Sequence, residues 1–109
     1  MKHFLGEFEE IILLTILILG EDAYGVSIKE EMENRLRRKV SIGALHTALQ
    51  RMTTKGYVTS DFGEVTKERG GKRKRYFRVS SFGLDALEKS RLDRLQLWAS
   101  IPRFSSEPS

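Results

Sequence analysis

The feature that most constrains this chain is an apolar segment, Ile11–Leu19, which is interrupted only by Thr15. A helix that is apolar on nearly every side needs more than one covering surface. The segment is too short to cross a bilayer, which takes roughly 20 apolar residues, and it follows acidic residues instead of the basic start of a signal peptide. We therefore expect a cytoplasmic protein with no membrane partner, in which a helix over residues 7–19 is buried in a core or a dimer interface.

Repeating apolar stripes predict two more helices. The second helix is expected over residues 23–36, with Asp22 placed to cap its start. Ser41 is a suitable cap for a third helix over residues 42–55, which Gly56 would end. The stripes that these helices would bury are Tyr24, Ile28, Met32 and Leu36 in the second helix and Leu45, Ala48, Leu49 and Met52 in the third.

Two segments rich in aromatic and β-branched residues, 57–62 and 74–80, predict strands. The polar loop between them, residues 63–73, makes them a β-hairpin with a protruding tip. Side chains alternate between the two faces of a strand, so the neighbours Tyr76 and Phe77 point to opposite faces. The aromatic core is therefore expected to contain Tyr57, Phe62 and at least one of Tyr76 and Phe77.

The resulting order is three helices, two strands and a last helix that follows Ser80 or Ser81. This order is typical of a winged helix-turn-helix, so we expect an α+β, mainly α fold with a two-stranded wing and a C-terminal dimerisation helix. A length of 109 residues suits a single domain. The expected division is residues 1–80 for the winged helix-turn-helix, 81–101 for the dimerisation helix and 102–109 for a flexible tail.

Positive charge is concentrated in the expected hairpin. Residues 64–78 contain seven basic and two acidic side chains, whereas the whole chain has a net charge of only +4. The expected third helix contains no Asp or Glu. A polar helix without acids can enter a major groove about 12 Å wide while neighbouring cations meet the phosphate backbone. The combination predicts binding to double-stranded DNA.

The exposed face of the third helix would supply the contacts to the bases. Gln50 can bond adenine in a bidentate way, Arg51 could bond guanine or a phosphate, and Ser41 suits a phosphate. Alternation along the hairpin places Arg73 and Arg75 on one face and Lys72 and Lys74 on the other, so not all four can face DNA. The expected DNA-binding residues are Ser41, Ala44, His46, Thr47, Gln50, Arg51, Lys72, Arg73, Lys74 and Arg75.

The sequence predicts no catalytic residue, cofactor or metal site. The chain has no cysteine and only two histidines, His3 and His46. Gly70-Gly71 lies within the predicted hairpin, which is not the strand-to-helix context of a nucleotide-binding loop. We therefore expect a protein that is not an enzyme.

Several segments resemble the PadR family of transcriptional regulators. They are Leu5–Glu10, Leu19–Gly25 and Ser41–Leu45, and above all the wing segment 63–83 with its Gly-Gly-basic tip and its aromatic pair. The similarity covers roughly residues 4–90. The family usually has Tyr where this chain has His46, so the contact made there would change and could become pH-sensitive.

The resemblance implies a repressor that forms a homodimer through its N- and C-terminal helices and binds palindromic DNA. It also implies that a small aromatic or drug-like effector relieves repression. Trp98 is favoured as an interface anchor over an effector contact. The residues expected at the dimer interface or at an effector site are Phe8, Ile12, Leu95 and Trp98.

The alternative function is a winged-helix protein-interaction module that does not bind DNA. Such a module would carry acids or an apolar patch on the third helix. The sequence of that helix shows neither, so DNA binding is the preferred hypothesis.

Overall fold

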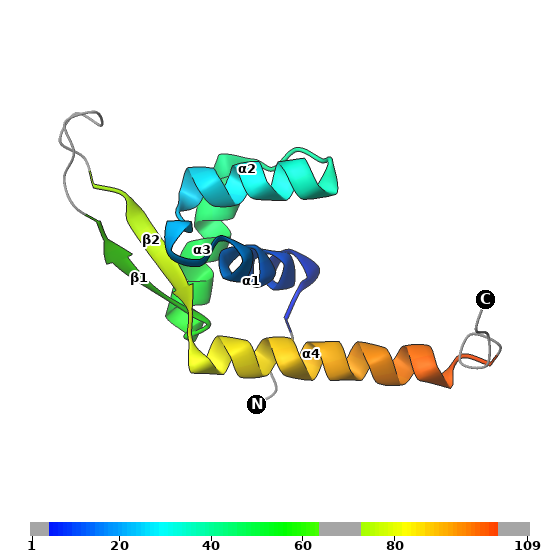
Figure 1. The fold of residues 1–109 in the computed structure, drawn as a ribbon. Coiled ribbons are helices and arrows are strands. Elements are labelled where there is room, and N and C mark those ends of the chain that lie inside the picture. Colours follow the sequence, from blue (N-terminus) through cyan, green and yellow to red (C-terminus); the bar gives the residue numbers. More distant parts are fainter. Residues whose placement is uncertain (1–4, 64–72, 103–109) are drawn as a thin grey trace.

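The structure is a computed structural model that describes residues 5–63 and 73–102. Figure 1 shows three helices grouped beside a β-hairpin, with a long fourth helix that begins at the base of the hairpin and runs beneath the first helix. This is the expected winged helix-turn-helix arrangement, and the helices dominate it. The elements are α1 (Glu7–Leu19), the 3-10 turn η1 (Gly20–Asp22), α2 (Gly25–Leu36), α3 (Ile42–Lys55), β1 (Val58–Phe62), β2 (Arg75–Val79) and α4 (Ser81–Ser100).

The core lies where α1, α2 and α3 meet the base of the hairpin. The apolar stripes predicted for α2 and α3 are buried there with two exceptions. Tyr24 is half-buried, and Leu36, at the end of α2, is 44% exposed. Including Leu36 in the core was therefore wrong. The fully buried large side chains are Tyr57, Ile12, Leu13, Ile28, Met32, Leu45, Leu49, Met52 and Val58.

Local capping signals set the bounds of α1 and α3, which coincide with the predicted ranges. The Ser41 side chain accepts the Ala44 N–H at 3.2 Å, as an N-cap does. Gly20 and Gly56 follow the two helices with φ of 64° and 87°, which glycine adopts without a Cβ clash. The predicted bounds of these two helices are confirmed.

The start of α2 differs from the prediction. The helix begins at Gly25, and Asp22 does not cap it because residues 20–22 form η1 instead. Tyr24 is extended, and its N–H donates to the Ser27 hydroxyl at 2.9 Å. The reason lies in the hairpin: Tyr24 forms a β-bridge with Tyr76, and the Phe77 N–H donates to the Ala23 carbonyl at 2.8 Å. Ala23 and Tyr24 pair with β2 and so cannot be helical.

The two strands form an antiparallel hairpin with Val58 opposite Val79 and Phe62 opposite Arg75. Tyr57 and Phe77 are buried and Tyr76 is half-buried, as the alternation predicted. Phe62 is 61% exposed, so its assignment to the core was wrong. It lies at the outer end of β1, away from the base of the hairpin that packs against the helices.

The helix α4 follows β2 directly. Ser80 caps it, accepting the Gly83 N–H at 3.0 Å. Only Gly83 and Leu87 of α4 are buried in the chain, so most of this helix is exposed. None of the helices in the described part of the chain is both long and apolar enough to span a membrane.

Candidate nucleic-acid interface

The outward face of α3 is exposed along its length. Since successive residues turn by about 100°, the side opposite the buried stripe carries Gly43, Thr47, Gln50 and Thr54. All four residues are exposed, and α3 contains no acidic side chain. The helix therefore presents short polar side chains to solvent without negative charge, which suits insertion into a polyanion groove.

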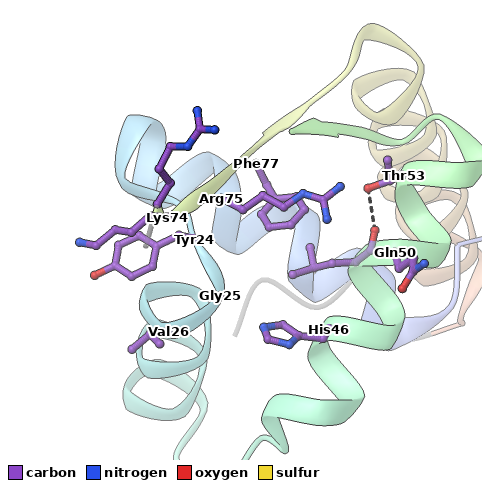
Figure 2. A pocket seen from close by; sticks show the side chains of 11 residues that line it. Tyr24, Gly25, Val26, His46, Gln50, Thr53, Lys74, Arg75 and Phe77 are labelled. Carbon is purple, nitrogen blue, oxygen red and sulfur yellow. Dashed lines mark hydrogen bonds between the residues drawn. The ribbon is translucent and has the colours of Figure 1, made fainter. Parts of the chain in front are cut away.

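A cleft of about 430 Å³ separates α3 from the wing. We call this space the wing cleft. Figure 2 shows His46 on α3 pointing toward Gly25 at the start of α2, with Lys74 beside Tyr24 and with Arg75 beside Phe77. The lining residues are Tyr24, Gly25, Val26, His46, Leu49, Gln50, Thr53, Arg73, Lys74, Arg75 and Phe77.

His46 is packed closely against the start of α2 although it is exposed. A Cβ atom on Gly25 would lie only 2.9 Å from His46 Nε2. The absence of a side chain at Gly25 therefore lets the imidazole lie at the cleft wall. This placement keeps a polar ring between the two helices, on the flank of α3 that faces the wing.

Aromatic rings hold the wing cations in place. Lys74 Nζ lies 4.2 Å from the centre of the Tyr24 ring, while the guanidinium carbons of Arg73 and Arg75 lie 5.5 and 5.8 Å from the centre of the Phe62 ring. Such cation–π contacts are worth about 0.5–1 kcal/mol at exposed sites. Arg73 and Arg75 thus share one face, as alternation predicted, whereas Lys72 lies outside the described residues.

Arg75 is the most firmly held of these cations. Its Nε donates to the Ser60 hydroxyl at 2.9 Å, and its guanidinium carbon lies 5.5 Å from the Phe77 ring centre. Phe77 is a core residue, so the position of Arg75 is tied to the packed base of the hairpin. The exposed Phe62 contributes to the same face, a role that its apolar character did not reveal in the sequence.

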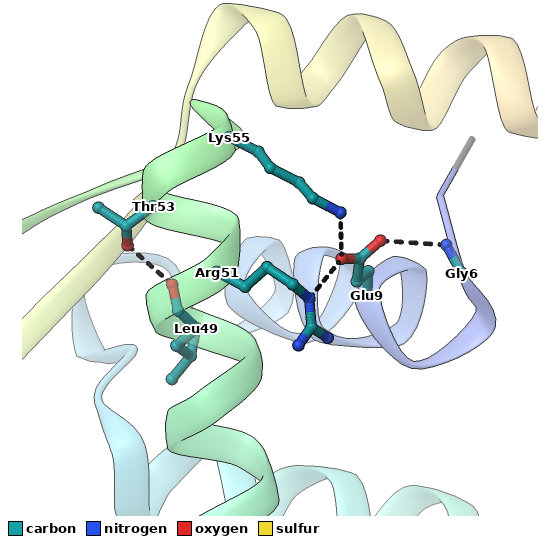
Figure 3. A network of polar contacts seen from close by, with 6 residues as sticks. All are labelled: Gly6, Glu9, Leu49, Arg51, Thr53 and Lys55. Atoms are coloured by element: carbon teal, nitrogen blue, oxygen red, sulfur yellow. Dashed lines mark hydrogen bonds and ion pairs between the residues drawn. The ribbon is translucent and has the colours of Figure 1, made fainter. Parts of the chain in front are cut away.

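Arg51 lies on the other flank of α3, away from the wing cleft. Figure 3 shows Arg51 and Lys55 reaching the carboxylate of Glu9 on α1, at 3.4 and 3.3 Å. The same carboxylate accepts the Gly6 N–H at 3.1 Å. Burial favours a higher pKa for Glu9, but the Gly6 hydrogen bond and the two cations outweigh it, so its pKa lies below the ordinary value.

Ser41 and Ala44 lie at the start of α3, and both are exposed. Of the predicted DNA-binding residues, the structure thus brings together five around the wing cleft: His46, Gln50, Arg73, Lys74 and Arg75. Thr47 lies on the outward face beside them. Arg51 is directed to α1 in this structure, so its expected contact with guanine or phosphate stays a prediction.

A second hollow, of about 400 Å³, lies between α1 and α4, and we call it the apolar groove. Leu95 and Trp98 line it and are 50% and 55% exposed. Arg94 and Glu10 form an ion pair of 2.7 Å across it. The groove residues are Glu10, Leu14, Leu17, Leu84, Leu87, Glu88, Arg91, Arg94, Leu95 and Trp98.

The α1 side of this surface differs from the expected set. Ile12 is 0% exposed in the core of its own chain, so it cannot touch a partner directly, and Phe8 is half-buried against the same core. The apolar side chains that α1 exposes are Leu14, Leu17 and Ile18, at 45%, 47% and 52%. Because α1 is apolar on nearly every side, its hydrophobicity did not indicate which side faces outward.

Three helices followed by a two-stranded wing, with an acid-free α3 beside the cations that lead into β2, define a winged-helix protein. Comparison with known proteins gives its family. The Transcriptional regulator PadR-like family matches residues 13–89, and the chain belongs to that family. Its members regulate transcription and are not enzymes.

Individual proteins are similar to this chain in sequence or in fold. An uncharacterised protein of Lysinibacillus sphaericus is 38% identical over 80 residues, which are 72% of this chain and 69% of that protein. A transcriptional regulator from Clostridium thermocellum has 26% identity and a TM-score of 0.64, covering 81% of this chain and 80% of that one. A PadR-like transcription factor from Bacteroides fragilis has the same fold, with 21% identity, a TM-score of 0.66 and coverage of 80% and 81%.

Proposed function

We propose that this protein is a sequence-specific, double-stranded DNA-binding regulator that acts as a repressor in the cytoplasm. The observation that carries the proposal is the wing cleft, where the acid-free helix α3 and the cations Arg73, Lys74 and Arg75 face a common space. DNA fits this arrangement because α3 can lie in the major groove while the wing meets the backbone beside it.

Within this proposal the residues divide between reading bases and binding phosphates. Gln50 and Thr47, on the outward face of α3, contact base edges, and His46 contacts the groove edge. Arg73, Lys74 and Arg75 bind phosphates or reach an adjacent minor groove, together with Lys72. Ser41 binds a phosphate at the start of α3. Ala44 and Arg51 contact the far edge of the groove, which requires Arg51 to leave Glu9.

The proposed regulator is a homodimer on a palindromic site. Two copies of α3 would then read half-sites about 34 Å apart. Support comes from the exposed apolar side chains of α1 and α4, because a surface of this kind marks an interaction site. The described part of α4 continues to Ser100 with every residue after Ser90 exposed, so it is available to a second subunit.

We also propose that a small aromatic effector relieves repression by binding between the subunits near Trp98. The apolar groove supports this, since it combines apolar walls with charged side chains at its edge. Quenching of Trp98 fluorescence by planar aromatic compounds is the expected result. A flat response across a diverse compound panel would remove this part of the proposal.

The test of DNA binding uses a site selected from a random pool of duplexes, titrated at several salt concentrations. The variant Arg73→Ala/Lys74→Ala should lower the slope of log K against log salt by about 0.9 for each phosphate that it no longer neutralises. The control Lys89→Ala removes a cation from an exposed ion pair on α4 and should leave the slope unchanged. An equal slope for the wing variant and wild type would refute the role of the wing.

The random-pool selection itself tests the function as a whole. Enrichment of a palindrome is expected. No enrichment and no duplex binding at low salt, with a protein partner retained, would instead favour the interaction-module alternative.

A further inference from the structure

We propose that the turn Arg37–Arg38–Lys39, between α2 and α3, is a second phosphate-binding element that grips DNA at the start of α3. We call it the basic turn, and its assignment rests on the proposed DNA-binding function. It immediately precedes Val40 and the cap Ser41, whereas the wing cleft is lined by α3 residues from His46 onward. The two cationic elements thus lie toward different ends of the exposed face of α3.

The backbone of Arg37 gives the first argument. Its φ of 55° and ψ of 43° are left-handed, and it is the one described residue other than glycine with a positive φ. A helix end of this type normally carries glycine, since a Cβ disfavours the conformation. An arginine in this position costs stability in the folded chain. Strain of this kind points to a role for the side chain that glycine could not fill.

The second argument is that the basic turn is held rigidly from both sides by one residue. The Glu33 carbonyl accepts the Arg37 N–H at 2.8 Å, and the Glu33 carboxylate accepts the Val40 N–H at 2.8 Å. Lys29 Nζ lies 3.1 Å from the same carboxylate, and Val40 is buried. The backbone is therefore fixed before any ligand arrives, which lowers the entropy cost of binding.

The third argument is charge. All three side chains of the basic turn are exposed. Their nearest acids on α2 are already engaged, since Glu31 pairs with Arg35 and Glu33 with Lys29. Lys39 is attracted by Glu33, but within the described part of the chain none of the three cations forms an ion pair. Three unneutralised cations on a fixed backbone suit successive phosphate oxygens.

Contacts near both ends of α3 would fix the position of the helix in the major groove. Phosphate contacts set the register of a protein on the duplex, and base contacts then discriminate between sequences. The wing alone would hold α3 on one side only. The basic turn therefore adds affinity that does not depend on sequence and aligns Thr47 and Gln50 with the bases.

The first experiment exploits the strain at Arg37. The variant Arg37→Gly removes the disfavoured Cβ, so its Tm should rise by a few degrees, while its affinity for the selected duplex should fall about 3- to 10-fold. Arg37→Lys keeps both the strain and the charge, so it should retain the wild-type Tm and most of the affinity. A variant that gains stability and binds DNA as tightly as wild type would overturn the proposal.

The second experiment leaves Arg37 intact and uses Arg38→Gln/Lys39→Gln. Its salt slope should fall by about 0.9 for each phosphate left without a cation, with the same preferred sequence as wild type. Lys89→Ala is again the control. Suppose that wild type binds the duplex and that the salt slope falls for the wing variant but not for Arg38→Gln/Lys39→Gln. The phosphate-binding role of the basic turn is then refuted, while the proposed DNA-binding function stands. If wild type does not bind duplex DNA, the proposed function fails first.

Discussion

At the scale of single residues, the Glu9 carboxylate joins two helices. It lies near the start of α1 and pairs with two cations of the last turns of α3 (Figure 3), so one buried side chain connects the element at the proposed subunit surface to the proposed reading helix. A carboxylate that is held by a backbone N–H and two cations is favoured in its ionised form.

The variant Glu9→Gln should therefore be less stable by about 1–2 kcal/mol at neutral pH, because it loses the charged contacts of the carboxylate. The loss is no larger because the two partner cations are half-exposed and regain water. The folded-state pKa of Glu9 lies below its ordinary value of 4.5. Its stabilisation is thus complete above the unfolded-state pKa and disappears as the pH falls through the lower folded-state pKa. Urea melts from pH 7 to pH 3 should show a smaller decrease in stability for the variant than for wild type. An equal loss of stability with falling pH in the variant and in wild type would contradict this role of Glu9.

Gln50 is exposed on the outward face of α3 and lines the wing cleft, and in the proposed complex it discriminates between bases. Gln50→Ala should change preference at one base pair per half-site by about 1–3 kcal/mol. Thr54→Ala is the matched control farther along the same line. Binding-site selection with both variants is the measurement, and an unchanged preferred sequence for Gln50→Ala would exclude base recognition by this residue.

At the scale of elements, the junction between the hairpin and α4 depends on Gly83. A Cβ atom there would overlap the Tyr57 carbonyl oxygen and come within 2.9 Å of a Val79 methyl group. Tyr57 is fully buried and its ring stacks on Phe82, with ring centres 5.2 Å apart. Only glycine allows α4 to begin so close to the base of β1.

Gly83→Ala should destabilise the fold by about 2 kcal/mol, because the backbone must shift to relieve the overlap. Glycine-to-alanine within a helix would otherwise be stabilising. Ala86→Gly, in the same helix, is the comparison for that intrinsic preference. Chemical denaturation with circular dichroism measures both variants, and a stabilised Gly83→Ala would show that the helix start can move freely.

The elements also show what the sequence could and could not predict. The sequence predicts helices over residues 7–19 and 42–55 with their observed bounds because the signals that begin and end them are local, such as the cap Ser41 and the terminating Gly20 and Gly56. It misses the start of α2 because Ala23 and Tyr24 pair with β2, some fifty residues away. It misplaces Phe62 because an aromatic side chain can bind cations on a surface as well as fill a core.

The candidate site was predictable to a similar extent. Residue type and order gave the acid-free helix and the cationic hairpin. The packing of His46 against Gly25 and of Lys74 on Tyr24 needed the fold, since these contacts join segments that are distant in sequence. The pairing of Arg51 with Glu9 likewise depends on how α1 crosses α3.

At the scale of the whole molecule, the apolar groove gathers exposed large apolar side chains from α1 and α4. Burial of such a surface against a second copy would contribute about 25 cal/mol for each Å². Leu95→Glu should therefore convert a dimer to a monomer and abolish tight binding to the palindrome. Leu97→Glu, outside the groove and 68% exposed, is the control. Light scattering after size exclusion gives the mass; an unchanged dimer would exclude this face.

The direct passage from β2 into α4 has a mechanical consequence. Ser80 alone separates them; its N–H donates to the Tyr57 carbonyl at 2.9 Å, and its hydroxyl donates to the Gly56 carbonyl. There is no linker in which a rotation of α4 could be absorbed. In the proposed dimer, a reorientation of the C-terminal helices by a few degrees would therefore also rotate each wing, and it would change the distance between the two α3 helices.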